Sequence, residues 1–127
     1  MTGEVLPEET LSRFIYSSRH FAVTKGIVKY HAFMPDPYDN LSVFRTTDWT
    51  EERIWEQGKT APGRTLKARG ELLASVVMEV EELFIDPDDE PPGHANIKGW
   101  PAGPENKSKR MEIAMSLASE AKLLLFP

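Results

Sequence analysis

At residues 41–45 the chain reads Leu-Ser-Val-Phe-Arg, a pattern that predicts a short β-strand. Successive side chains of a strand point to opposite faces of its sheet, which places Ser42 and Phe44 together on one face. The other three side chains share the opposite face: Leu41, Val43 and Arg45. A second strand is expected at residues 94–97, His-Ala-Asn-Ile, which lie between two proline-rich breaks.

Turn signals and β-prone composition predict further strands. Gly26, in Thr-Lys-Gly, suits the positive φ of a tight turn, so the segments on either side of it are expected to form a hairpin. A valine-rich run that is followed by Asp-Pro predicts another strand. The expected strand segments are residues 20–23, 27–33, 76–80 and 83–85, and residues 35–40 are expected to form a loop.

Helical signals are clearest near the C-terminus. From residue 105 to residue 124, apolar side chains recur with the period of an amphipathic helix. Its expected apolar face holds Met111, Ala114, Met115, Leu117, Ala118 and Ala121. Earlier, the segment Asp48-Trp-Thr-Glu51 matches a capping box and predicts a short helix that ends at Gly58, in a left-handed turn. Two more short helices are expected, at residues 7–15 and 65–74.

Together these elements predict an α+β fold. We expect a mostly antiparallel sheet, two short central helices and a C-terminal amphipathic helix packed on the sheet. A chain of 127 residues suits one domain over residues 1–127, with residues 1–6 as a frayed start. No apolar run is long enough to cross a membrane and the N-terminus does not resemble an export signal, so a cytoplasmic protein is expected.

The composition excludes several kinds of site. Without cysteine, the chain has no disulfide, no thiolate nucleophile and no thiolate zinc site. A formal net charge of −5 argues against nucleic-acid binding through bulk electrostatics, because phosphate neutralisation supplies most non-specific affinity. The acidic run at residues 86–90 lies close to His94, but it fits no known metal-binding spacing. We interpret it as a solvated loop and expect neither a metal nor a cofactor.

Candidate binding residues lie on the expected strands and beside them. Three histidines, His20, His31 and His94, would supply an acid and a base if the sheet brought them together. Basic residues interleaved with aromatic residues over positions 13–45 are the mixture that binds phosphates and stacks rings. We therefore expect a polar cleft that binds a protein or a phosphate-bearing partner. Its predicted residues are His31, Arg45, His94, Asn96 and Trp100.

An enzymatic alternative comes from the order of residues along the chain. Arg13, then Ser42 on a strand, then Glu79-Val-Glu81 resembles the arginine, serine and Glu-x-Glu series of ADP-ribosyltransferase toxins. The resemblance implies that Arg13 grips the phosphates of NAD and that Ser42 supports the site. It also implies that Glu81, with Glu79 beside it, stabilises the developing ribosyl cation. The family's Ser-Thr-Ser is Leu-Ser-Val here, so the match rests on three points.

A broader resemblance spans residues 11–125. The segments Arg13-Phe-Ile, Ala32-Phe-Met-Pro35 and those at residues 41–45 and 94–97 resemble a pattern found in a group of short bacterial proteins. This resemblance implies a stand-alone domain and carries no mechanism, and we expect a bacterial or phage-related protein. Binding is therefore the leading expectation, NAD-dependent transfer is the alternative, and catalysis is left open.

Overall fold

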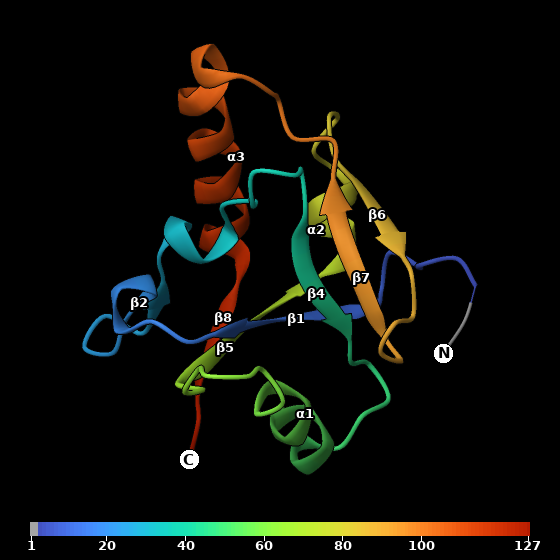
Figure 1. The fold of residues 1–127 in the computed structure, drawn as a ribbon, viewed down its shortest axis with the longest axis vertical. Coiled ribbons are helices and arrows are strands. Elements are labelled where there is room, and N and C mark those ends of the chain that lie inside the picture. The colour runs from blue at the N-terminus through green and yellow to red at the C-terminus, as the bar shows by residue number, and fades with distance from the viewer. Residues whose placement is uncertain (1–2) are drawn as a thin grey trace.

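The computed structural model describes residues 3–127, within which six strands form one antiparallel sheet in the order β6-β7-β4-β1-β5-β8 (Figure 1). Two more strands, β2 and β3, form a small hairpin. The strands are β1 Thr10–Ile15, β2 Phe21–Ala22, β3 Ile27–Val28, β4 Leu41–Arg45, β5 Ala68–Leu73, β6 Phe84–Pro87, β7 His94–Lys98 and β8 Lys122–Leu125. The helices are α1 Glu51–Gly58, α2 Ala74–Met78 and α3 Lys107–Glu120, with 3₁₀ helices η1 Ser18–His20, η2 Tyr30–Phe33 and η3 Pro104–Asn106. The predicted α+β class with a mostly antiparallel sheet is confirmed.

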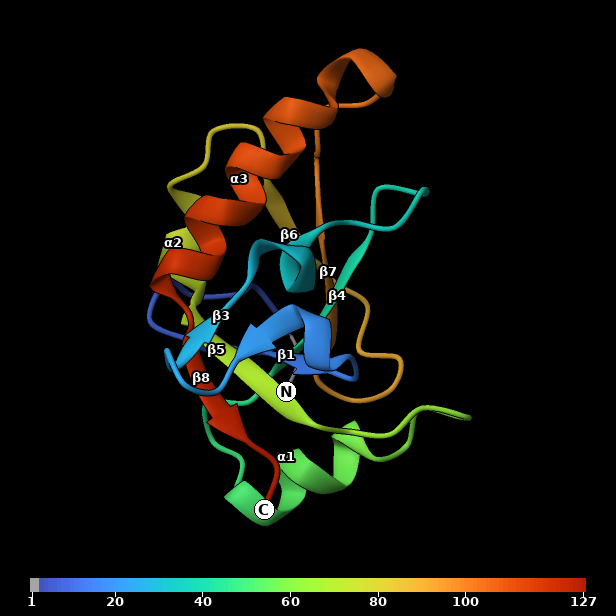
Figure 2. The same ribbon diagram turned by 90° about the vertical axis from the view of Figure 1, so that its left-hand side faces the viewer.

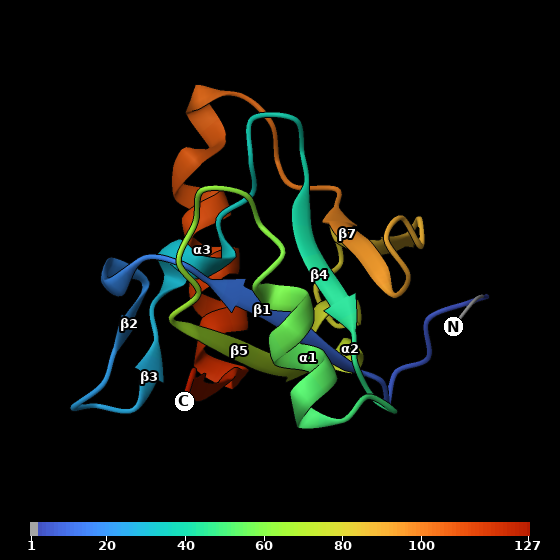
Figure 3. The ribbon, with the colours of Figure 1, turned by 60° about the horizontal axis from the view of Figure 1, so that its bottom comes forward.

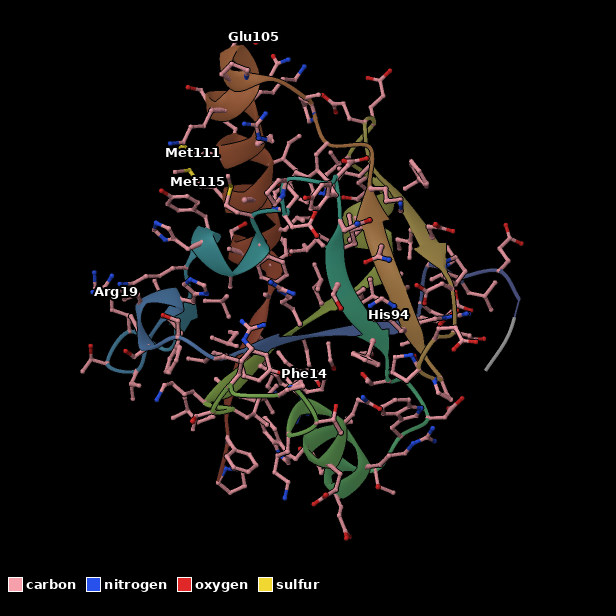
Figure 4. The ribbon with its side chains drawn as sticks, viewed as in Figure 1. Phe14, Arg19, His94, Glu105, Met111 and Met115 are labelled. Atoms are coloured by element: carbon pink, nitrogen blue, oxygen red, sulfur yellow. The ribbon has the colours of Figure 1, made fainter. Side chains whose placement is uncertain are left out.

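The main hydrophobic core lies between one face of the sheet and helices α2 and α3 (Figure 2). Alternation along β4 and β7 buries Val43 and Ile97 completely on this face. From α3, the core receives Ile113, Ala114, Leu117 and Ala118. The predicted C-terminal helix is thus confirmed, although Met115, expected on its apolar face, is 48% exposed (Figure 4).

The chain after α3 returns to the sheet instead of continuing the helix. Residues Lys122–Leu125 form the edge strand β8, which pairs with β5. The predicted helix therefore extends too far, because residues 122–125 satisfy their backbone groups by pairing with β5.

Helix α1 covers part of the opposite face of the sheet (Figure 3). A smaller hydrophobic cluster lies beneath it, formed by Phe14, Phe44, Ile54 and Leu66. The helix begins two residues later than the capping box predicts, because its N-cap is Thr50 and not Asp48. The Thr50 hydroxyl accepts a hydrogen bond from the Arg53 N–H at 3.2 Å.

Helix α1 ends at Gly58 as predicted, but the glycine serves close packing and not a left-handed turn. Gly58 does not have a positive φ. A Cβ atom at this position would lie 2.7 Å from Phe14 Cδ1 and 2.9 Å from Leu66 Cδ2. The missing side chain therefore lets the end of α1 approach β1.

We expect Gly58→Ala to lower the free energy of unfolding by about 1–3 kcal/mol, the usual cost of overpacking a core. Helix propensity alone predicts the opposite sign, since alanine is favoured over glycine by roughly 1 kcal/mol inside a helix. Urea unfolding of the wild-type and variant proteins decides between the two. A more stable variant would show that Phe14 and Leu66 yield to the added methyl group.

Three local predictions are wrong because long-range strand pairing overrides local preference. Residues 7–15, expected as a helix, contain β1, which pairs with both β4 and β5. Residues 65–74, also expected as a helix, contain β5. Residues 76–80, expected as a strand, lie in and just after α2, where Val77 is fully buried in the main core.

The predicted hairpin around Gly26 is confirmed. Strands β2 and β3 pair across the turn, and Gly26 has a φ of 65°. The second arm is shorter than expected, because residues 30–33 form η2. Phe33 of η2 is fully buried in the main core.

Candidate functional site

Strands β1 and β4 pair at one end only. Leu11 lies opposite Arg45 and Ser12 opposite Phe44, and beyond these pairs the two strands diverge (Figure 1). A cleft of about 320 Å³ lies on the α1 side of this divergence. Its walls come from β1, β4, the start of β7 and the loop between α1 and β5. We call it the Ser42 cleft.

Ser42 and His94 line the Ser42 cleft, and together with Asp88 they form a hydrogen-bonded series. Ser42 Oγ lies 2.7 Å from His94 Nε2, and His94 Nδ1 lies 2.7 Å from Asp88 Oδ1. An ionised carboxylate only accepts hydrogen bonds, so Nδ1 carries the ring proton of neutral His94. The Nε2 atom then accepts the hydrogen bond of the Ser42 hydroxyl. This arrangement is the one that general-base activation of a hydroxyl requires.

Strand pairing explains why Ser42 and His94 meet. In the antiparallel pair of β4 and β7, Ser42 lies opposite Asn96, and Phe44 lies opposite His94. Ser42 and His94 are therefore diagonal neighbours on one face of the sheet, within reach of each other's side chains. His94 stands at the start of β7 (Figure 4).

The turn before β7 positions Asp88 against His94. The N–H groups of Asp88 and Asp89 both donate to the His94 carbonyl, at 3.2 and 3.0 Å. Burial raises the pKa of Asp88, but hydrogen bonds from the His94 ring and the Glu90 N–H outweigh it, and the pKa lies below its ordinary value. Asp88 is consequently ionised at neutral pH and able to orient His94.

Two arginines also line the Ser42 cleft. Arg13 Nε donates to the Ala32 carbonyl at 2.8 Å, and its Nη1 donates to the Ser42 carbonyl at 3.0 Å. The Arg13 guanidinium thus spans the gap between the diverging strands. Arg64 lies over the Tyr16 ring, with 4.2 Å between the guanidinium carbon and the ring centre.

Arg13 and Arg64 are not held in ion pairs among the described residues. Within residues 3–127, no ion pair joins either arginine to a carboxylate. Burial lowers the pKa of Arg13 to about 10 and the charge of Arg64 acts in the same direction, although the charge of Asp36 acts on Arg13 to raise its pKa. Arg13 still carries its proton at neutral pH, so the Ser42 cleft is a positive site in an acidic protein.

Arg45, a predicted binding residue, is buried in an ion pair instead. Its Nε and Nη2 atoms donate to the two carboxylate oxygens of Glu9, each at 2.9 Å, and Arg45 is 1% exposed. Its guanidinium also donates to the carbonyls of Gly3 and Glu4. These contacts hold part of the segment that we expected to be frayed, and Val5 within it is buried. Residues 1–2 lie outside the described residues.

Trp100 lines a different cleft from His94. Its ring is buried, and the indole N–H donates to the Ile97 carbonyl at 2.9 Å. The cleft beside it is larger, about 450 Å³. There the Asp39 carboxylate accepts from two backbone N–H groups, and Arg110 donates to two backbone carbonyls. The smaller Ser42 cleft is the stronger candidate because it combines two arginines with the hydrogen-bonded Ser42 and His94.

Of the other predicted binding residues, only His94 lines the Ser42 cleft. His31 stacks against His20, with ring centres 6.2 Å apart. Burial, with the charge of His31 second, lowers the pKa of His20. His94 is instead bonded to Ser42. Asn96 lies opposite Ser42 on β7 but is not among the residues that line the Ser42 cleft.

The residues of the ADP-ribosyltransferase resemblance are only partly brought together. Arg13 and Ser42 are in contact through the hydrogen bond to the Ser42 carbonyl. Glu79 and Glu81 follow α2, and neither lines the Ser42 cleft. The structure thus joins the arginine and the serine and leaves the two carboxylates elsewhere.

Arg64 was missed as a member of the site. Asp88 was interpreted as part of a solvated acidic loop, and Tyr16 falls in the basic and aromatic stretch without being predicted as a binding residue. Asp88 stands six residues before His94 in a proline-rich turn, a spacing at which a hairpin turn can bring two side chains together. Arg64 follows Pro-Gly in a loop, and nothing in the local sequence indicates which strands that loop covers.

Comparisons with protein families, with curated proteins and with solved structures found no match to this chain. None of the helices in residues 3–127 has both the length and the apolar character that a membrane span needs. Function must therefore be inferred from the geometry of the Ser42 cleft.

Proposed function

We propose that this protein binds a small phosphate-bearing molecule in the Ser42 cleft. The proposal rests on Arg13 and Arg64, which line one cleft without a carboxylate partner among residues 3–127. A guanidinium offers a planar fork of donors that suits phosphate oxygens. A bound anion would relieve the repulsion between the two charges.

The shape and the remaining walls of the Ser42 cleft favour a small ligand. Its volume of about 320 Å³ lies near the lower end of the range for small-molecule sites. Phe14, Phe44 and Tyr16 give it aromatic surface beside the arginines. The combination of positive charge and aromatic wall suits a phosphate attached to an apolar or ring-bearing group.

We expect Arg64→Gln to weaken the binding of inorganic pyrophosphate at least about tenfold, because one charge-assisted hydrogen bond contributes roughly 1.5–3 kcal/mol. Isothermal titration calorimetry of the wild-type and variant proteins measures this change. Arg64 is the residue to replace because its side chain is exposed, whereas Arg13 also bridges backbone groups of the fold.

Arg53→Gln is the matched control. Arg53 is also an exposed arginine stacked on an aromatic ring, 3.9 Å from the centre of the Trp49 ring, and it does not line the Ser42 cleft. This variant should bind pyrophosphate as the wild type does. Equal affinity of the wild-type, Arg53→Gln and Arg64→Gln proteins would remove the Ser42 cleft as the binding site.

A further inference from the structure

The binding proposal leaves one feature of the cleft unused, the hydrogen bond between the Ser42 hydroxyl and His94. Binding an anion requires the arginines, but it does not require a serine that donates to a histidine oriented by a carboxylate. All three residues have defined partners: Ser42 Oγ with His94 Nε2 at 2.7 Å, and His94 Nδ1 with Asp88 Oδ1 at 2.7 Å. This is the relation of nucleophile, base and orienting group found in covalent acyl transfer.

We propose that Ser42 is the nucleophile of an esterase that hydrolyses small carboxylic esters carrying a negatively charged group. The inference rests on the proposed function, because the two arginines make the cleft positive: Arg64 would hold that charged group and Arg13 would face the reacting carbonyl. It adds a reaction and a substrate class to the binding site.

The first half of the reaction uses the hydrogen bonds already present. The Ser42 Oγ attacks the ester carbonyl carbon while His94 Nε2 takes the hydroxyl proton, and the carbonyl oxygen becomes an oxyanion. The oxyanion reforms the carbonyl, the bond to the alcohol oxygen breaks, and the alcohol leaves with the proton from Nε2. Asp88 stabilises the histidine cation that exists between these steps.

The second half regenerates the enzyme with water. Water gives a proton to His94 Nε2 and its oxygen attacks the acyl carbon. The bond between Ser42 Oγ and that carbon then breaks, Oγ takes the proton back, and the free acid leaves. One ester and one water give one acid and one alcohol, and no further reactant is needed.

The position of Arg13 suits it to stabilise the oxyanion. Its Nη1 atom donates to the backbone carbonyl of Ser42 at 3.0 Å, so the guanidinium contacts the backbone of the nucleophilic residue. No hydrogen bond from its Nη2 atom is found within residues 3–127. A fixed cation at a site of developing negative charge is the usual device for this purpose.

The first test asks whether Ser42 is nucleophilic. The wild-type protein is incubated with a fluorophosphonate, and the modified residue is located by mass spectrometry. We expect modification at Ser42 and its loss in Ser42→Ala, while Ser12→Ala keeps it. Ser12 is a suitable control because its hydroxyl also has a side-chain partner, Thr46, at 2.7 Å. The wild-type experiment needs no substitution, so it holds even if Ser42→Ala fails to fold.

The second test measures kcat/KM on two esters, neutral p-nitrophenyl acetate and the negatively charged mono-p-nitrophenyl ester of succinic acid. We expect the charged ester to be preferred, and Ser42→Ala to lose at least about 100-fold in rate on it, because the variant has no nucleophile to form the acyl intermediate. Arg64→Gln should lower kcat/KM on the charged ester about tenfold, consistent with one lost charge-assisted contact. Arg53→Gln, which lies outside the Ser42 cleft, should leave kcat/KM on both esters unchanged.

The outcomes separate the two proposals. Pyrophosphate binding without Ser42 modification or ester hydrolysis would overturn the esterase and leave the binding function in place. Ser42 modification with no preference for the charged ester and no pyrophosphate binding would overturn the binding function. Faster cleavage of bis(p-nitrophenyl) phosphate than of either carboxylic ester would overturn the substrate class.

Discussion

Glu9→Gln is expected to lower the free energy of unfolding by about 3–5 kcal/mol, because it leaves the buried guanidinium of Arg45 without a counter-charge. The two side chains are 7% and 2% exposed, so water cannot replace the lost carboxylate. Glutamine also offers one acceptor where Arg45 now binds two carboxylate oxygens. Urea unfolding at pH 7 measures the change.

Two comparisons isolate burial as the cause. Glu56→Gln removes an exposed pair with Lys59, whose atoms are also 2.9 Å apart, and should cost less than about 1 kcal/mol. The double variant Glu9→Leu with Arg45→Met replaces the buried pair by apolar side chains and should be more stable than Glu9→Gln alone. Wild-type stability of Glu9→Gln would show that Arg45 does not depend on this carboxylate.

The same ion pair makes stability depend on acid pH. The hydrogen bond from Arg45 lowers the pKa of Glu9 below its ordinary value, against the opposing effect of burial. A carboxyl group with a lowered pKa in the folded state contributes stability that is complete above its unfolded pKa of about 4.3. That contribution disappears as the pH falls through the lower folded pKa. The Glu9→Gln protein should therefore lose less stability than the wild type between pH 5 and pH 3, as measured by urea unfolding at each pH.

The sequence predicted the strands whose side chains alternate clearly. Strands β4 and β7 lie where the alternation of residues 41–45 and 94–97 placed them, with Val43 on the core face and Ser42 on the other. Strand β5 could not be found in this way, because Ala-Arg-Gly-Glu-Leu-Leu contains several good helix formers. Its neighbours β1 and β8 are distant in sequence, so local preference does not report the pairing.

The sequence indicated several residues of the site, but it did not indicate which of them are in contact. His94 and Ser42 were both named as candidates, but in separate hypotheses, because their contact depends on the register between β4 and β7. Arg45 was expected to face a ligand, and its partner Glu9 lies 36 residues earlier in the chain. Both pairings depend on which strands are neighbours, and that information is absent from side-chain alternation within a strand.

Gly99→Ala is expected to lower the free energy of unfolding by roughly 2–5 kcal/mol, through two additive causes. Gly99 follows β7 with a φ of 93°, a conformation that costs a residue with a Cβ atom about 1–2 kcal/mol. The added Cβ would also overlap the backbone carbonyl oxygen of Glu82, which cannot rotate away. Relief of that overlap requires a backbone shift, for which the usual cost is about 1–3 kcal/mol.

Gly26→Ala separates the two causes. Gly26 also has a positive φ, 65°, but nothing lies within 4 Å of a Cβ atom placed there, so only the conformational cost of about 1–2 kcal/mol applies. Urea unfolding of both variants should rank Gly99→Ala as clearly less stable.

Because the Gly99 N–H donates to the Asp39 carboxylate at 3.0 Å, a backbone shift at Gly99 should also disturb the 35–40 loop. Amide hydrogen exchange of this loop should then be faster in Gly99→Ala and unchanged in Gly26→Ala. Equal destabilisation in the two variants would instead mean that Glu82 moves aside at little cost.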